Sequence, residues 1–257
     1  APGRVGARWM ADQAKALGLE TWTNPVDLGV RVELPAVVME DLTRVAYETK
    51  FVYFSKTFDD RVRTFCMNPY GEVVRETLGD IVTVNGHSWA NKKTENTNFA
   101  ILVSANFTEP FDDAIGYGRY VATLANMLGK GVIVQRLGDL LAGRRTTLSR
   151  LEKCTTTPTL KEAIPGDLSY CIPYRILTNI IEMLAGLDRV APGVNSGHTL
   201  LYGLEVKFYS NRVRLDRNLQ TQVEGLYAVG DGAGITRGLI QASCAGVIAA
   251  RAIAERY

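Results

Sequence analysis

Residues 221–234, TQVEGLYAVGDGAG, decide how the fold is interpreted. The apolar run Leu226–Val229 predicts a buried strand, and such continuous runs are typical of parallel strands covered on both faces. The run ends abruptly in Gly230–Gly232, where an aspartate stands between two glycines. A helix rich in small residues is expected to begin near Gly238 and to run to about residue 256. The stretch therefore predicts a strand, a tight turn and a helix in succession.

This order of elements predicts a ligand site at the carboxyl end of the strand. In open α/β sheets, ligands bind beyond such strand ends. Asp231 stands at this point, and its carboxylate can accept hydrogen bonds from hydroxyl groups, while Gly230 and Gly232 carry no side chain that would keep a ligand away from the backbone. The first N–H groups of the next helix suit an electron-rich carbonyl or phosphate. These residues predict a site for a polyhydroxylated, electron-rich cofactor.

The bulk composition is that of an ordinary globular chain and gives no sign of a nucleic-acid or membrane partner. The chain has 257 residues and a formal net charge of +2, with acidic and basic residues mixed throughout. No apolar run approaches the roughly 18 residues needed to span a bilayer. The four cysteines form no C-x-x-C pair, so we expect a reduced, cytoplasmic chain without a metal site. They are Cys66, Cys154, Cys171 and Cys244.

Local patterns predict a helical start followed by a β-rich segment. We expect a helix at Arg8–Leu17, a strand at 26–34 and a second helix from Pro35 to Glu48. Residues 51–89 alternate short β-branched runs with turn residues and predict an antiparallel meander. Residues 99–107 are apolar enough to form a central strand.

The second half of the chain is predicted to be mainly helical. The expected helices are Asp112–Leu128, Val132–Leu141 and Tyr174–Leu187. Residues 199–210 and 212–216 are expected to pair as a hairpin, because turn chemistry at Asn211-Arg212 separates them.

The spacing from Thr221 to Asp231 resembles a known cofactor signature. The pattern T-x-x-x-x-apolar-Tyr-apolar-apolar-Gly-Asp is similar to the second flavin-binding signature of FAD-dependent oxidoreductases with the glutathione-reductase type of fold. The resemblance implies that Asp231 binds the ribityl chain of FAD. It also implies that backbone around Gly238, Leu239 and Ile240 faces the isoalloxazine ring.

A wider resemblance extends over most of the chain. The segments GVRVELP, RTFCMNPYGEVV, VNGHSWA, NTNFAILVS and GDGAGITRGLIQAS are similar to uncharacterised bacterial FAD-dependent dehydrogenases. The opening APGR is similar to a turn that touches FAD in related enzymes, which implies that Gly3 lies near the cofactor. The sequence holds no G-x-G-x-x-G, the motif that cradles the FAD pyrophosphate in such proteins. It therefore resembles their C-terminal portion, and we predict that residues 1–257 alone bind FAD weakly or not at all.

The expected fold class is α/β plus α+β. Residues 1–24 and 196–257 would form an incomplete, Rossmann-like FAD-binding domain, and residues 25–195 an inserted substrate domain with an antiparallel sheet and helices. The full-length protein would be an FAD-dependent oxidoreductase, a dehydrogenase that moves electrons between the flavin and an unknown small-molecule substrate or electron partner. Two alternatives stay open: a non-enzymatic binding or assembly module, and a flavoprotein that modifies RNA.

Several other polar residues are assigned structural roles. Packing is favoured over a substrate contact for Cys66, and a surface or structural position over a proton donor near the flavin for His87. His198 is expected in a turn, and local turn bonding is favoured over a functional role for Asn96 and Asn98. Two interpretations of Arg237 stay open, because its charge would either stabilise a reduced flavin or lie solvated at the surface.

Overall fold

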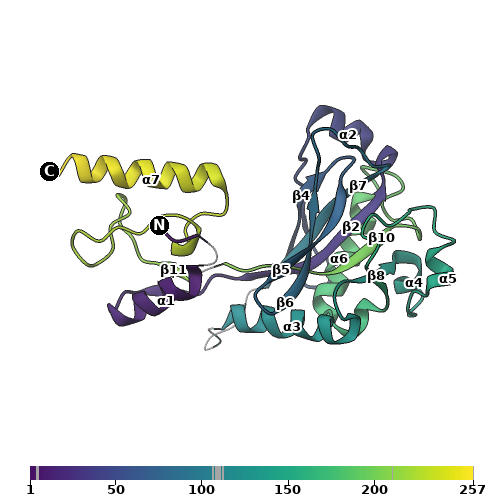
Figure 1. Cartoon of the computed structure of the whole chain (residues 1–257), viewed down its shortest axis with the longest axis horizontal. Coiled ribbons are helices and arrows are strands. Elements are labelled where there is room, and N and C mark those ends of the chain that lie inside the picture. The colour runs from purple at the N-terminus through teal and green to yellow at the C-terminus, as the bar shows by residue number, and fades with distance from the viewer. Residues whose placement is uncertain (4–5, 106, 108–110, 112, 210, 257) are drawn as a thin grey trace. The chain divides into compact units, whose positions relative to one another are not determined.

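The computed structural model describes residues 1–3, 6–105, 107, 111, 113–209 and 211–256 (Figure 1). These residues belong to two compact units, which are described separately. The smaller unit comprises Ala1–Val26, Asn106–Ile115 and Phe208–Tyr257. The larger unit comprises Asp27–Ala105 and Gly116–Lys207, so it extends past the boundary predicted at residue 195. That these units are an FAD-binding and a substrate domain stays a prediction.

A seven-stranded sheet forms the centre of the larger unit. Its strands are β2 (Val26–Pro35), β3 (Val52–Phe54), β4 (Arg61–Asn68), β7 (Asn96–Ala105), β8 (Ile133–Arg136), β9 (Ile164–Pro165) and β10 (Leu200–Lys207). The strand order is β3-β4-β7-β2-β10-β8-β9. The β8–β9 pair is parallel, whereas β3–β4, β4–β7, β2–β10 and β8–β10 are antiparallel. The predicted strand at 99–107 is confirmed as β7, inside the sheet, although Asn106 lies outside the described residues.

A separate hairpin covers part of this sheet. Strands β5 (Glu72–Leu78) and β6 (Ile81–His87) pair antiparallel, and they pack against β4, β7 and β10. The predicted meander is thus confirmed strand by strand, but its chain does not pair continuously, because β4 pairs with β7 rather than with β5.

Helices complete the larger unit and confirm its mixed α/β character. The helices between residues 36 and 187 are η2 (Ala36–Val38, a 3-10 turn), α2 (Glu40–Val45), α3 (Ala114–Gly129), α4 (Leu137–Leu141), α5 (Leu148–Leu151), η3 (Leu168–Tyr170, a 3-10 turn) and α6 (Tyr174–Leu187). Helix α6 has the predicted bounds and packs against β4 and β7 (Figure 1). The predicted start of α3 at Asp112 lies outside the described residues.

Two of the predicted helices were partly wrong. Pro35–Glu48 begins as the 3-10 turn η2 and continues only as the short α2. Residues 133–136 of the predicted helix at 132–141 are strand β8, and only Leu137–Leu141 is helical. The β-branched Ile133 and Val134 favour a strand, and β10 supplies its antiparallel partner.

Strand β2 is buried along both of its faces. Side chains alternate between the two faces of a strand. Leu28, Val30, Val32 and Leu34 form one row, whereas Asp27, Arg31 and Glu33 belong to the other, and all of these are at most 1% exposed. The sheet therefore carries a charged layer on one side and an apolar layer on the other.

The smaller unit is built from short elements. They are α1 (Ala7–Ala16), β1 (Thr21–Trp22), β11 (Arg212–Val213), η4 (Asp231–Ala233, a 3-10 turn) and α7 (Leu239–Ala254). A small apolar core joins Ala14 and Leu19 to Val213. The predicted hairpin of residues 199–210 with 212–216 was wrong, because β10 pairs with β2 and β8 while β11 pairs with β1.

The predicted strand Leu226–Val229 is not a regular strand. The run makes an isolated antiparallel bridge, between Gln220 and Tyr227. A parallel strand needs a neighbouring strand on which to pair, and β1–β11 is the one ladder among the described residues of this unit.

None of the described helices combines the length and the apolar character that crossing a membrane requires.

The close approach of strands at Gly29 gives a test of the larger unit. A Cβ atom at this position would lie 1.8 Å from the carbonyl oxygen of Ile101. Gly29→Ala should therefore lower the free energy of unfolding by about 3 kcal/mol or more, since buried backbone cannot move aside cheaply. Urea unfolding followed by circular dichroism measures this change.

Gly186→Ala provides the matched control within the same unit. Its Cβ would lie 3.4 Å from a Tyr53 ring carbon, which is ordinary contact, and it would remove a glycine from helix α6. We expect unchanged or slightly raised stability, by up to about 1 kcal/mol. Equal effects of the two substitutions would contradict the close approach at Gly29.

Candidate functional site

The turn around Asp231 in the smaller unit is held in a defined shape. Gly230 has φ +84° and Gly234 has φ +73°, which glycine adopts without the strain that a side chain causes. The Thr236 hydroxyl donates a hydrogen bond of 2.5 Å to Asp231 Oδ1. Asn24 Nδ2 donates to the carbonyl oxygen of Gly234 at 3.1 Å. The carboxylate is therefore positioned by its own turn.

Gly232 meets the opening residues of the chain. Its N–H donates a hydrogen bond of 2.8 Å to the carbonyl oxygen of Pro2, and a Cβ at Gly232 would lie 2.3 Å from that oxygen. A side chain at Gly232 would thus clash with the chain itself, and the role of this glycine in giving a ligand access to the backbone stays a prediction. The contact brings the turn that contains Gly3 against the Asp231 turn, so predicted site residues from both ends of the sequence lie together.

The start of helix α7 is open. Gly238 is the N-cap, and Leu239 and Ile240 are 89% and 78% exposed. The guanidinium carbon of Arg237 lies 3.9 Å from the ring centroid of Tyr209, a cation–π contact. The backbone N–H of Arg237 also donates to Gln241 Oε1 at 3.0 Å. These contacts give Arg237 a structural role at the helix start and leave both interpretations of its charge open.

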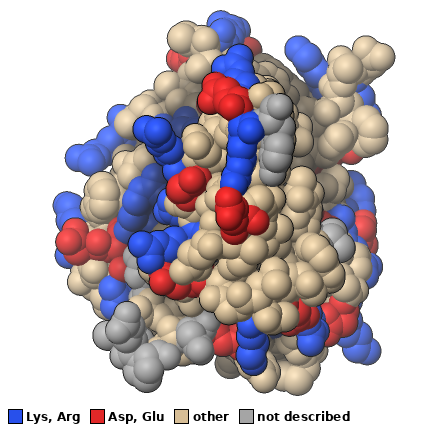
Figure 2. Space-filling view, turned by 90° about the vertical axis from the view of Figure 1, so that its left-hand side faces the viewer, with Lys and Arg blue, Asp and Glu red and all other residues tan. Residues whose placement is uncertain are grey.

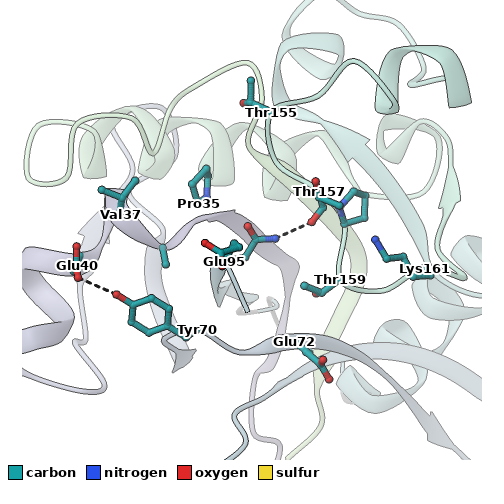
Figure 3. Close-up of a pocket in the computed structure, with 13 residues that line it drawn as sticks. Pro35, Val37, Glu40, Tyr70, Glu72, Glu95, Thr155, Thr157, Thr159 and Lys161 are labelled. Atoms are coloured by element: carbon teal, nitrogen blue, oxygen red, sulfur yellow. Dashed lines mark hydrogen bonds between the residues drawn. The ribbon is translucent and has the colours of Figure 1, made fainter. Parts of the chain in front are cut away.

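The larger unit contains a pocket of about 760 Å³ that sequence reasoning missed (Figure 3). It opens where the end of β2, the start of α2, the β4–β5 turn and residues 155–161 meet. The lining residues come from segments far apart in the sequence, so no local motif could indicate it. They are Pro35, Ala36, Val37, Glu40, Tyr70, Glu72, Glu95, Asn96, Thr155, Thr157, Pro158, Thr159 and Lys161.

A buried carboxylate, Glu33, is hydrogen-bonded to residues that line this pocket. The Thr159 hydroxyl donates to Glu33 Oε1 at 2.5 Å, and Asn96 Nδ2 donates to the same atom at 3.0 Å. The Tyr202 hydroxyl and the Thr159 N–H donate to Oε2. None of the ion pairs among the described residues includes Glu33. Burial raises the pKa of Glu33, and the hydrogen bonds from Thr159, Tyr202 and Asn96 oppose this rise.

Two other carboxylates, on the rim of the pocket, are paired with neighbouring basic side chains. Glu40 accepts hydrogen bonds of 2.9 Å from the Tyr70 hydroxyl and from Arg44, and these lower the pKa of Glu40. Glu72 accepts hydrogen bonds from Lys92 and from Trp89, which lower the pKa of Glu72. The rim therefore keeps both groups ionised at neutral pH.

Glu95 and Lys161 differ from these rim carboxylates. Both side chains are exposed, and neither belongs to an ion pair within the described part of the chain. In Figure 3 they lie on opposite sides of Thr159, and the Lys161 side chain extends into the pocket. Among the described lining residues, the pocket thus presents one negative and one positive group that no ion pair occupies.

Two residues that were predicted to lie in turns belong to this buried network. Asn96 and Asn98 lie in β7, where Asn96 bonds Glu33 and Asn98 Oδ1 accepts from Arg31 at 3.3 Å. The expectation of local turn bonding was wrong for the side chains of both Asn96 and Asn98, because their partners are distant in sequence. The carbonyl oxygen of Cys66, a residue with φ +46°, accepts from Arg31 at 2.7 Å.

The histidines take the structural positions that were expected. His198 Nδ1 accepts a hydrogen bond of 3.1 Å from the Thr155 N–H. The exposed His87 packs edge-on against Trp89, with ring centroids 4.4 Å apart. Within the described ranges, no group of three or more His, Cys, Asp or Glu side chains could hold a metal ion.

The raised pKa of Glu33 gives a pH-dependent prediction. A carboxyl group whose pKa is higher in the folded than in the unfolded chain stabilises the folded state at pH values below its unfolded pKa. This contribution is lost as the pH rises through the folded pKa. From pH 4.5 upward, Glu33 should progressively lower the free energy of unfolding. Glu33→Gln should remove this component, as measured by urea unfolding over a pH series.

Glu40→Gln is the opposite-sign control for this series. The pKa of Glu40 is lowered, so its contribution is present above pH 4.5 and is lost as pH falls through the folded value. The two variants should change the pH profile of stability in opposite directions. A profile of Glu33→Gln identical in slope to that of the wild type would contradict the assignment.

Comparison with known sequences adds two findings. Residues 25–208 match a family described as "FAD-dependent protein, C-terminal domain-like". The chain is also 28% identical over 264 residues to an uncharacterized protein of Clostridium beijerinckii. That alignment covers 90% of this chain and 46% of the relative, so the chain spans about half the length of the protein it matches.

Proposed function

Because the chain belongs to the FAD-dependent proteins that carry this C-terminal domain, we propose that it is part of an FAD-dependent oxidoreductase. The whole protein would act as a dehydrogenase, moving electrons between FAD and an unknown substrate or electron partner. FAD supplies the redox chemistry when it is bound, and this chain's residues bind and orient it.

The observation that carries the proposal is the meeting of the Asp231 turn with the opening turn of the chain. A carboxylate only accepts hydrogen bonds, which suits the hydroxyls of a ribityl chain. A Cβ added at Gly3 or at Gly238 would meet no atom within 4 Å, so there is open space beside both stretches of backbone. The residues present therefore fit part of an FAD molecule.

We propose individual roles for these residues on that basis. Asp231 would hold ribityl hydroxyls, and Gly230, with its positive φ, would set the direction of the carboxylate. Backbone at Gly238, Leu239 and Ile240 would face the flavin ring, and Gly3 would lie near the cofactor. Gly232 would act indirectly, by allowing Pro2 to approach the turn.

The distribution of charge bears on the RNA alternative. On the face seen in Figure 2, basic and acidic side chains are interspersed. Binding to RNA phosphates relies on clustered Lys and Arg. This face therefore lacks the clustered basic side chains that the RNA alternative would favour.

Substitution of Asp231 tests the ribityl assignment in the full-length protein. Asp231→Ala should weaken FAD binding by roughly 10- to 150-fold, because a hydrogen bond to a charged group contributes roughly 1.5–3 kcal/mol. The flavin content of the purified protein, read from its absorbance, measures the loss. Asp12→Ala, an exposed acid in α1 of the same unit, is the control and should retain flavin. Undiminished flavin content in Asp231→Ala would remove the assignment.

A second measurement addresses residues 1–257 alone. This sequence contains no G-x-G-x-x-G to cradle the FAD pyrophosphate. We expect isothermal titration calorimetry to show weak FAD binding or none, and submicromolar affinity would contradict this expectation.

A further inference from the structure

We propose that the pocket of the larger unit binds a zwitterionic small molecule of the amino acid or short peptide class. The proposal does not depend on the flavin, because every residue that carries it lies within the larger unit. A volume of about 760 Å³ falls in the range of small-molecule sites.

The orientation of the Asn96 amide is fixed by its neighbours. Nδ2 donates to Glu33 Oε1 at 3.0 Å and to the carbonyl oxygen of Thr157 at 2.8 Å. A backbone carbonyl can only accept, so the NH2 group of the amide must face it. Asn96 is 5% exposed and lines the pocket, and its Oδ1 accepts no hydrogen bond from the described residues. A buried amide thus presents a fixed acceptor to the pocket.

Glu95, the preceding residue, adds a second acceptor with a negative charge. Its carboxylate has no ion-pair partner in the described ranges, unlike Glu40 and Glu72 on the same rim. An acceptor amide and a carboxylate from consecutive residues together suit a protonated amine, which brings three donors and a positive charge. This side of the pocket therefore selects an ammonium group.

Lys161 lies on the other side of Thr159 from Glu95 and suits a negatively charged group on the ligand (Figure 3). Its ammonium extends into the pocket and likewise lacks an ion-pair partner among the described residues (Figure 3). It suits a carboxylate on the ligand. A molecule that carries both an ammonium and a carboxylate satisfies Glu95, Asn96 and Lys161 at once. A simple amine leaves Lys161 without a ligand partner, and a simple acid leaves both Glu95 and Asn96 without one.

The buried layer below explains why the acceptor stays in place. Glu33 holds both Asn96 and Thr159, and Tyr202 holds Glu33 from the other side. These residues are positioning groups, which keep the polar atoms of the pocket floor fixed before a ligand arrives. Such preorganisation lowers the entropic cost of binding.

The probes for the experiment are the twenty free α-amino acids and the di- and tripeptides of glycine and alanine. Each is tested on the 257-residue chain by thermal shift, and those that stabilise it are measured by isothermal titration calorimetry. N-acetyl and C-terminal amide derivatives of the best probe remove the ammonium and the carboxylate in turn. We expect each derivative to bind at least about tenfold more weakly than the zwitterion.

Variants then assign the two charges to residues. Glu95→Gln should weaken binding of the zwitterion at least about tenfold but change binding of the N-acetyl derivative little. Lys161→Met should likewise weaken binding of the zwitterion but change binding of the amide derivative little. Glu152→Gln and Lys153→Met, exposed and outside the pocket lining, should leave affinity unchanged. Circular dichroism of the variants checks that they fold.

Three results would overturn the proposal. The first is that no probe stabilises the chain at millimolar concentration. The second is that an amine or an acid alone binds as tightly as the zwitterion. The third is that Glu95→Gln and Lys161→Met bind like the control variants. None of these results bears on FAD retention, so failure here is distinguishable from failure of the flavin proposal.

Discussion

The buried ion pair between Arg31 and Glu205 is the interaction on which the larger unit depends. Both side chains are fully buried, and Arg31 Nε and Nη2 donate to the two carboxylate oxygens at 2.8 Å each. The remaining guanidinium hydrogens bond Cys66, Asn85 and Asn98, so one side chain links β2 to β10, β4, β6 and β7. Removing Glu205 would cost about 3–5 kcal/mol, because the buried charge of Arg31 is left uncompensated. Removing Arg31 would leave Glu205 with Lys207, whose Nζ lies 3.1 Å from Oε1.

This pair also determines how closely the β5–β6 hairpin approaches the sheet. A Cβ atom at Gly86 would lie 2.7 Å from Arg31 Nη1 and 2.2 Å from Asn98 Oδ1, so β6 needs a glycine where it crosses the guanidinium. Glu33 lies two residues further along β2, on the same face, and none of the described ion pairs includes it. Two of the three buried ionisable side chains of this strand are therefore stabilised differently: Arg31 by an opposite charge, and Glu33 by hydrogen bonds alone.

The sequence predicted those parts of the fold that local patterns determine. The bounds of α6, the position of β7 inside the sheet and the strands of the meander all follow from apolar periodicity and turn residues. Partners distant in sequence explain the failures. Residues 133–136 become a strand because β10 lies beside them, and Leu226–Val229 does not form a ladder because the described residues of its unit provide no strand on which it can pair. The local sequence around Asn98 is typical of a turn, but its side chain accepts a hydrogen bond from Arg31, which is distant in sequence.

The two candidate sites also differ in whether local sequence or distant partners determine them. Asp231 stands in a compact motif whose spacing can be recognised in the sequence. Its turn is shaped mainly by residues within six positions of it, with Pro2 and Asn24 as the distant contacts. The pocket depends on Asn96, whose acceptor points into it because Glu33 and the Thr157 carbonyl orient its amide. Because Glu33 and Thr157 are far from Asn96 along the chain, this acceptor exists only in the folded protein. A site built on long-range hydrogen bonds gives no local signal, so only the structure could indicate it.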